Sequence, residues 1–173
     1  MKLMVDNWRW SDVPFYLRHG KSLSKRATEI VIRWKDTPNI LFNKHANRVK
    51  SNMLVLRIQP HEGFALRANA KVPGSGTEIR DVRMEFDYAD AFGAEPPEAY
   101  ERLLHDALRG DSTLFTRRDE VEIEWAIADP ILSNWAKDDT PPFFYDQGSW
   151  GPDESHDFMA RDGRRWHTPL TGK

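Results

Sequence analysis

The residues of this sequence best suited to bind a ligand are four cations within residues 13–26, which read VPFYLRHGKSLSKR. They are Arg18, Lys21, Lys25 and Arg26. The apolar start of the stretch favours a strand, and Gly20 is expected to adopt a positive φ in the turn behind it. Such a turn would expose backbone N–H groups beside a lysine, which suits a phosphate or a carboxylate. From spacing alone, a solvated basic turn between two strands explains the pattern better than an anion site.

Other patterns that could carry chemistry are weaker. Neither GxGxxG nor GxxxxGK[ST] occurs in the chain, so binding of a dinucleotide by the usual phosphate loops is not expected. His105 and Asp106 are adjacent on a predicted helix, where they point about 100° apart and cannot act as a base and its orienting partner. The acids within residues 119–124 have no histidine at metal-ligand spacing, so they predict a solvated face. Catalytic and metal-binding residues are therefore not assigned, and His19 is expected to fill a strand end.

The composition indicates one globular domain. The chain has 173 residues, 39% of them hydrophobic, which is enough for a core. Its formal net charge of −2 gives no general reason to expect a nucleic acid or an anionic membrane as partner. The absence of cysteine excludes disulfides and thiolate chemistry. No run approaches the roughly 20 apolar residues of a membrane span, and the first residues lack a secretory core, so we expect a soluble cytoplasmic protein.

Hydrophobic alternation predicts four strands with an apolar side, which is expected to be buried in the first of them, and two predicted helices can only partly cover the broad face of the four. The four segments are residues 28–35, 52–59, 63–70 and 81–88. The short connection at residues 60–62 favours an antiparallel hairpin that places Arg57 and Arg67 on one face. Between the first two strands, residues 38–50 are expected to form a solvated basic loop.

Helical spacing of apolar residues predicts helices over residues 99–108 and 118–135, with a short helix possible over 154–161. The first should pack on the sheet and end at Gly110. In the second, Pro130 should kink or divide the helix. The fold class is therefore α+β, an antiparallel sheet backed by helices, with residues 138–153 mostly loop. No internal repeat or linker divides the chain into further domains.

Several segments together are similar to the C-terminal part of the glucose-6-phosphate dehydrogenase family. They are NWRW, VPFYLRHGKSL, NMLVLRIQPHEG, KVPG, EAYERLLHDALRGDSTLFTRRDEVEIEW, DPIL and GSWGP, which occur in this order from residue 7 to residue 152. In that family the dinucleotide-binding domain and the catalytic histidine lie upstream of NWRW. The resemblance thus implies that residues 1–173 are a partial C-terminal substrate-binding and dimerisation domain without the dinucleotide-binding domain.

The resemblance also assigns substrate-binding residues. Lys21 matches the lysine that contacts the sugar phosphate in the family, Arg26 matches a second basic position, and Gln59 matches a glutamine that reaches the substrate in some relatives. Charge-assisted hydrogen bonds from such groups are about twice as strong as neutral ones. Arg18 and Arg57 match arginines of a separate structural NADP site in some eukaryotic relatives. Ala27 and Val31 replace basic residues of those relatives, so a second nucleotide site is not expected here.

For function, the resemblance implies the C-terminal portion of an enzyme that oxidises glucose 6-phosphate to 6-phosphogluconolactone with NADP, in the pentose phosphate pathway. The chain would contribute sugar-phosphate binding and subunit pairing, as a homo-oligomer or with an N-terminal dehydrogenase half. NADP is expected to serve the complete enzyme and not to bind this chain alone. The chain alone should not catalyse the reaction, because neither a nicotinamide site nor a suitably placed base is encoded. The alternative is a non-catalytic sugar-phosphate-binding or dimerisation module.

Overall fold

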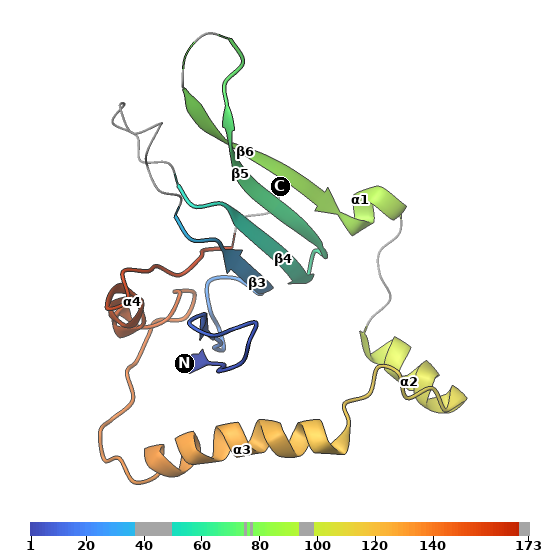
Figure 1. Cartoon of the computed structure of the whole chain (residues 1–173). Helices are drawn as coiled ribbons and strands as arrows, with labels where there is room; N and C mark the ends of the chain where they lie inside the picture. The colour runs from blue at the N-terminus through green and yellow to red at the C-terminus, as the bar shows by residue number, and fades with distance from the viewer. Residues whose placement is uncertain (37–49, 75, 77, 94–98, 170–173) are drawn as a thin grey trace. The chain divides into compact units, whose positions relative to one another are not determined.

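The computed structural model of the chain describes residues 1–36, 50–74, 76, 78–93 and 99–169 (Figure 1). The chain divides into two compact units. We call Met1–Thr28 with Phe143–Lys173 the loop unit and Glu29–Pro142 the sheet unit. The predicted basic loop lies outside the described residues except for Lys50, and so does the proline pair before the first predicted helix.

Four strands form the sheet of the sheet unit, in the order β3-β4-β5-β6 (Figure 1). Their bounds are Thr28–Arg33, Met53–Gln59, Gly63–Lys71 and Ile79–Asp87. Strand β5 pairs antiparallel with β4 on one side and with β6 on the other, with Val55 opposite Ala65 and Leu66 opposite Met84. The predicted strands, the hairpin at residues 60–62 and the shared face of Arg57 and Arg67 are confirmed by this register.

The apolar face predicted to be buried in the first strand is exposed, with Ile30 at 52% and Ile32 at 42%, and the buried residues of the neighbouring strands lie on the opposite face of the sheet. Val55 is 6% exposed and Ala65 is 7% exposed. Met84, on the apolar face, is 52% exposed. The physical reason lies in the long polar side chains of the other face: the Arg57 guanidinium reaches across β5 and forms an ion pair with Glu85 at 3.0 Å. Alternation of apolar and polar residues identifies the two faces of a strand. It does not show which face is buried by other side chains of the same chain.

Three helices belong to the sheet unit: α1 (Tyr88–Phe92), α2 (Ala99–Arg109) and α3 (Arg118–Trp135). The bounds of α2 and α3 agree with the predictions. Pro130 lies inside α3 without dividing it. The expected packing of the first predicted helix on the sheet is wrong, since Leu104 is 67% and Leu108 is 90% exposed. An apolar stripe at helical spacing predicts the helix but not the surface that covers it.

The loop unit contains two short strands and one helix. Strands β1 (Lys2–Met4) and β2 (Pro14–Tyr16) pair antiparallel, and α4 spans Asp153–Ala160, close to the predicted short helix. Met159 of α4 is buried, and the ring of Phe158 contacts Tyr16 edge to face at 6.1 Å between ring centres. Together these contacts support the predicted α+β class, an antiparallel sheet with helices. Within the described residues, no helix is both long and apolar enough to cross a membrane.

Candidate functional site

The candidate site is the loop between β2 and β3, which carries the four cations. Lys21 and Arg26 are both exposed. Among the residues that the structure describes, neither the Lys21 ammonium nor the Arg26 guanidinium has a hydrogen-bond or ion-pair partner. Two unpaired cations five positions apart on one loop can both donate hydrogen bonds to an anion. The loop thus has the chemistry that a phosphate site requires.

The backbone of this loop is held by a distant segment of the same unit. The Gly148 N–H donates to the Ser22 carbonyl, and the Ser24 N–H donates to the Ser149 carbonyl, each at 2.8 Å. The Tyr145 hydroxyl donates to the Lys21 carbonyl at 2.8 Å. The loop is therefore fixed from one side by residues that lie more than a hundred positions away in the sequence.

The turn itself differs from the prediction at Gly20. The residue with a positive φ is Ser22, at 55°, and Gly20 is outside that region. A Cβ at Gly20 would lie 3.1 Å from the Tyr145 hydroxyl oxygen and 3.2 Å from a Leu23 methyl carbon. Glycine is therefore favoured here by close packing, whereas the left-handed conformation falls on Ser22, whose carbonyl is bound by Gly148.

Arg18, at the start of the loop, is held by aromatic rings instead of facing a ligand. Its guanidinium carbon lies 5.1 Å from the centre of the Trp150 ring and 4.8 Å from that of Trp166. It also donates to the His167 carbonyl at 3.3 Å. Burial lowers the pKa of Arg18. Cation–π contacts of this kind explain why a partly buried arginine is tolerated without a carboxylate.

The third predicted substrate residue, Gln59, ends β4 in the sheet unit and is exposed. Lys21 and Arg26 lie together on one loop of the other unit, so their convergence with Gln59 stays a prediction. Arg57, two residues before Gln59, pairs with Glu85 and also lies 3.7 Å from Asp87. Its charge is thus neutralised by strand β6.

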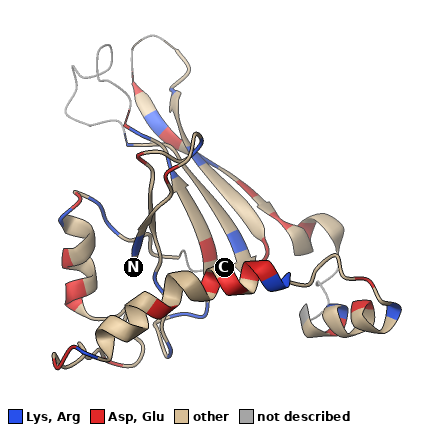
Figure 2. Ribbon diagram, turned by 60° about the horizontal axis from the view of Figure 1, so that its bottom comes forward, with Lys and Arg blue, Asp and Glu red and all other residues tan. Residues whose placement is uncertain are grey.

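The patterns dismissed from the sequence behave as surface or structural groups. The His105 Nδ1 and Asp106 Oδ1 atoms are 3.7 Å apart, too far for a hydrogen bond, while Arg102 donates to Asp106 at 3.2 Å. Figure 2 shows the acidic residues at the beginning of α3. Among the described residues, no group of three or more histidine, aspartate or glutamate side chains could hold a metal ion.

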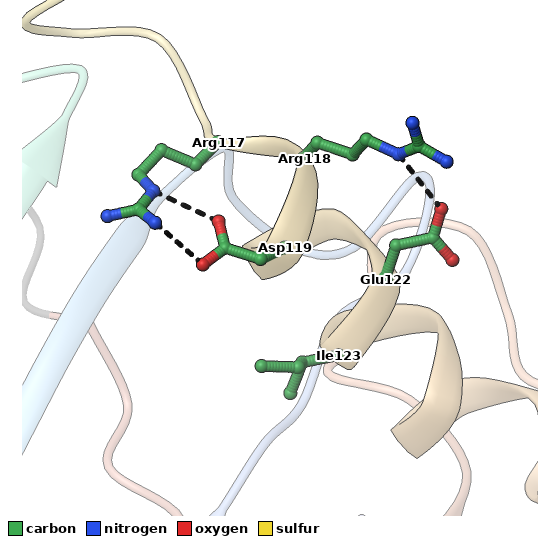
Figure 3. Close-up of a pocket in the computed structure, with 5 residues that line it drawn as sticks. All are labelled: Arg117, Arg118, Asp119, Glu122 and Ile123. Atoms are coloured by element: carbon green, nitrogen blue, oxygen red, sulfur yellow. Dashed lines mark hydrogen bonds and ion pairs between the residues drawn. The ribbon is translucent and has the colours of Figure 1, made fainter.

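A shallow hollow lies at the beginning of α3, but its charges are paired locally (Figure 3). Arg117 donates to the two carboxylate oxygens of Asp119 at 3.0 and 2.8 Å. Arg118 lies 3.8 Å from Glu122, which completes two ion pairs within the first turns of one helix. Exposed pairs of this kind contribute little to stability and leave no cation directed at a ligand. The hollow is therefore not a binding site.

Sequence reasoning missed the residues that support the loop. Tyr145, Trp150 and Trp166 lie in or beyond a stretch rich in proline and glycine, where periodicity carries no signal. The GSWGP segment could have pointed to them, because it contains Gly148, Ser149 and Trp150. A motif shared with a family shows that a segment matters without showing what it contacts.

Comparison with known proteins agrees with this description. Residues 1–167 match the family model described as glucose-6-phosphate dehydrogenase, C-terminal domain. The glucose-6-phosphate 1-dehydrogenase of Mycolicibacterium smegmatis is 47% identical over 167 residues, which cover 96% of this chain and 34% of that protein. The corresponding enzyme of Aggregatibacter actinomycetemcomitans is 45% identical, with 98% of this chain and 33% of that protein covered.

Solved structures lead to the same family. The crystal structure of glucose-6-phosphate 1-dehydrogenase from Mycobacterium avium superposes with a TM-score of 0.82 at 32% identity, covering 100% of this chain and 35% of that one. A glucose-6-phosphate dehydrogenase in complex with its substrate glucose 6-phosphate gives the same TM-score at 34% identity, covering 96% of this chain and 34% of that one. The chain spans about a third of the length of these relatives. It belongs to the glucose-6-phosphate dehydrogenase family, through that family's C-terminal domain.

Proposed function

We propose that this chain supplies the sugar-phosphate side of an NADP-dependent glucose-6-phosphate dehydrogenase of the cytoplasm. In this proposal residues 1–173 are a partial substrate-binding and dimerisation domain of an enzyme that makes 6-phosphogluconolactone in the pentose phosphate pathway. The substrate is glucose 6-phosphate, which is also the ligand named for one of the similar solved structures. The chemical step would need the dinucleotide-binding part of the enzyme as a partner.

The observation that carries the proposal is the pair of cations Lys21 and Arg26, which have no partner among the described residues, on a loop whose backbone is held by hydrogen bonds. A dianionic phosphate can accept several charge-assisted hydrogen bonds at once. Cations that have no carboxylate to satisfy them keep their full attraction for such an anion, in contrast to Arg57 and its partners. Gln59 would add a neutral amide for a sugar hydroxyl or for the phosphate.

NADP is proposed only for the complete enzyme, where it would accept a hydride from the sugar. A second nucleotide site on this chain does not fit the residues present. Arg18 is held between two indole rings, and Arg57 is paired with Glu85. Neither guanidinium is available to a nucleotide phosphate without losing these contacts. No step of the reaction is therefore assigned to this chain beyond binding and orienting the sugar phosphate.

Subunit pairing is proposed for the open apolar face of the sheet, defined here as Leu54, Leu56, Phe64, Leu66, Val82, Met84 and Phe86. The register places all seven side chains on one face. Phe64 and Phe86 stack with their ring centres 5.3 Å apart, and Phe92 of α1 extends the aromatic group at 6.4 Å from Phe86. Phe64, Val82 and Met84 of this face are 41–52% exposed, and exposed apolar patches are typical of protein–protein interfaces. A second copy of the same face would cover it.

The substrate proposal is tested by replacing Lys21 with alanine. The 173-residue chain is combined with the dinucleotide-binding part of the Mycolicibacterium smegmatis relative, and glucose 6-phosphate is titrated calorimetrically. Lys21→Ala should weaken binding by about 2–3 kcal/mol, because one charge-assisted bond to the phosphate is lost. Lys137→Ala, which removes an exposed lysine after α3, is the matched control and should leave the affinity unchanged.

Two outcomes would count against the proposal. Equal affinities for the wild type and Lys21→Ala would show that Lys21 does not face the phosphate. Binding in the assembly without NADPH formation would favour the alternative, a non-catalytic sugar-phosphate-binding module. NADPH formation by the assembly, with none from either part alone, supports the role of a domain in a divided enzyme.

A further inference from the structure

The backbone around Lys21 is tied to residues 145–149 at three neighbouring positions. The Lys21 carbonyl accepts from the Tyr145 hydroxyl, and the Ser22 carbonyl accepts from the Gly148 N–H, both at 2.8 Å. The Ser24 N–H completes the set by donating to the Ser149 carbonyl. Two of the three contacts are between backbone groups, so Tyr145 is the only side chain among them.

The hydroxyl of Tyr145 also packs closely on the residue before Lys21. A Cβ added to Gly20 would lie 3.1 Å from that oxygen, tighter than an ordinary contact. The same oxygen therefore leaves no room for a side chain at Gly20 and binds the Lys21 carbonyl. The hydrogen bond fixes the peptide that follows the Lys21 Cα atom, from which the flexible ammonium-bearing side chain extends.

The start of the loop is held separately. Arg18 lies between the rings of Trp150 and Trp166, and Trp166 donates its indole N–H to the Ser155 carbonyl at 2.9 Å. The loop is thus anchored at Arg18 and again at residues 21–24. A loop ordered before binding loses less conformational freedom when the ligand binds.

From this geometry we infer that Tyr145 is a positioning residue for the phosphate-binding cation, acting through its hydrogen bond to the Lys21 carbonyl. The inference rests on the proposed function, since it requires Lys21 to contact the phosphate. Removal of the hydroxyl keeps the ring and its packing but takes away one of the three hydrogen bonds that hold the backbone around Lys21. The ammonium then samples positions from which it cannot reach the phosphate.

A double-mutant cycle tests the inference in the assembly of the full chain with the dinucleotide-binding part. The variants are Tyr145→Phe, Lys21→Ala and the two combined. Affinity for glucose 6-phosphate is measured by calorimetry, together with KM and kcat. Tyr145→Phe alone should weaken binding about five- to tenfold, the effect of one neutral hydrogen bond, and should raise KM more than it lowers kcat. In the Lys21→Ala background the same change should have no further effect.

The controls separate positioning from folding. Tyr100→Phe removes a hydroxyl from an exposed tyrosine of α2 and should not change the affinity. If Tyr145→Phe weakens binding equally with and without Lys21, the hydroxyl acts through the fold and the inference is overturned. If Tyr145→Phe binds like the wild type while Lys21→Ala binds weakly, the inference fails but the proposed function stands. If the wild type does not bind, both fail.

Discussion

The loop unit and the sheet unit differ in the contacts that their charged and apolar side chains make. In the loop unit, aromatic rings hold Arg18 and a segment near the C-terminus holds the loop backbone. In the sheet unit, polar pairs gather on one face, while the other face leaves Met84 half exposed. The loop unit thus holds its basic loop with its own residues, and Lys21 and Arg26 have no partner there among the described residues. The sheet unit leaves apolar surface, for which an apolar partner is proposed.

The largest expected effect comes from placing a charge on the open apolar face. Met84→Lys should weaken self-association at least about 100-fold, because a two-fold interface would bury two unpaired ammonium groups. Binding of glucose 6-phosphate should be much less affected, since Lys21 and Arg26 belong to the loop unit. Sedimentation velocity over a range of concentrations measures the association, and calorimetry measures the binding.

Met84→Leu is the matched control, because it keeps an apolar side chain of similar volume at the same position and should leave self-association nearly unchanged. A wild-type chain that stays monomeric at micromolar concentration would contradict pairing through this face. So would a Met84→Lys variant that associates as strongly as the wild type.

The sheet also shows how far the sequence alone can be interpreted. Alternation over residues 52–59 and 63–70 and the short connection at residues 60–62 were sufficient to predict the hairpin. They were not sufficient to predict the buried face, because Val55 and Ala65 are covered by the polar side, where arginine and glutamate side chains span small residues. The period of apolar residues shows which residues of a strand share a face. Whether that face is buried depends on the side chains that pack against it.

The candidate site was partly predictable for a different reason. The cluster of four cations and the family resemblance pointed to Lys21 and Arg26, and both lie on the loop between β2 and β3. The contact of Tyr145 with Lys21 joins residues 124 positions apart, and no local pattern encodes such a pair. Strand β1, with three residues, is too short to show alternation, and it forms only by pairing with β2. Non-local contacts account for most of what the sequence did not reveal.

The next largest effect is expected at Gly63, where an added Cβ would come closer to neighbouring atoms than at the other described glycines. A Cβ at this position would lie 2.2 Å from the Phe86 carbonyl oxygen and 2.7 Å from an Arg57 guanidinium nitrogen. The carbonyl belongs to the neighbouring strand β6 and cannot move without disturbing the ladder. Gly63→Ala should therefore lower the free energy of unfolding by about 2 kcal/mol, as overpacking of a core typically does. Urea denaturation followed by circular dichroism measures the change.

Gly20→Ala makes the corresponding change in the loop unit, so that the packing of the two units can be compared. Its Cβ would meet only side-chain atoms, at 3.1 Å or more, so the neighbours can adjust and the loss of stability should be smaller. The variant should instead weaken binding of glucose 6-phosphate, because it displaces Tyr145 from the Lys21 peptide. Equal losses of stability for the two alanine variants would show that the loop is packed as rigidly as the sheet.

The smallest effect is expected from a polar cluster in the loop unit. Asp162 accepts a hydrogen bond from the Lys2 ammonium at 2.7 Å and another from the Tyr16 hydroxyl, and these bonds lower the pKa of Asp162 below its ordinary value of 3.8. The unfolded chain therefore binds more protons than the folded chain as the pH falls through this range. The stabilisation is present above the unfolded pKa and is lost as the pH falls through the folded pKa.

Asp162→Asn removes this titration and keeps nearly the same shape, so the variant should be less stable near neutral pH but lose less stability in acid. The thermal midpoint of each protein is measured from about pH 6 to about pH 2, and the two curves should converge as Asp162 becomes protonated. Other carboxylates titrate in both proteins and cancel in the difference. For Lys2 the dependence on pH is reversed, because the hydrogen bond to Asp162 raises the pKa of its ammonium. Its contribution to the free energy of unfolding is present below the ordinary pKa of 10.5 and is lost as the pH rises through the pKa of the folded chain. A difference between the curves that stays constant down to the lowest pH would show that Asp162 contributes through packing and not through its charge.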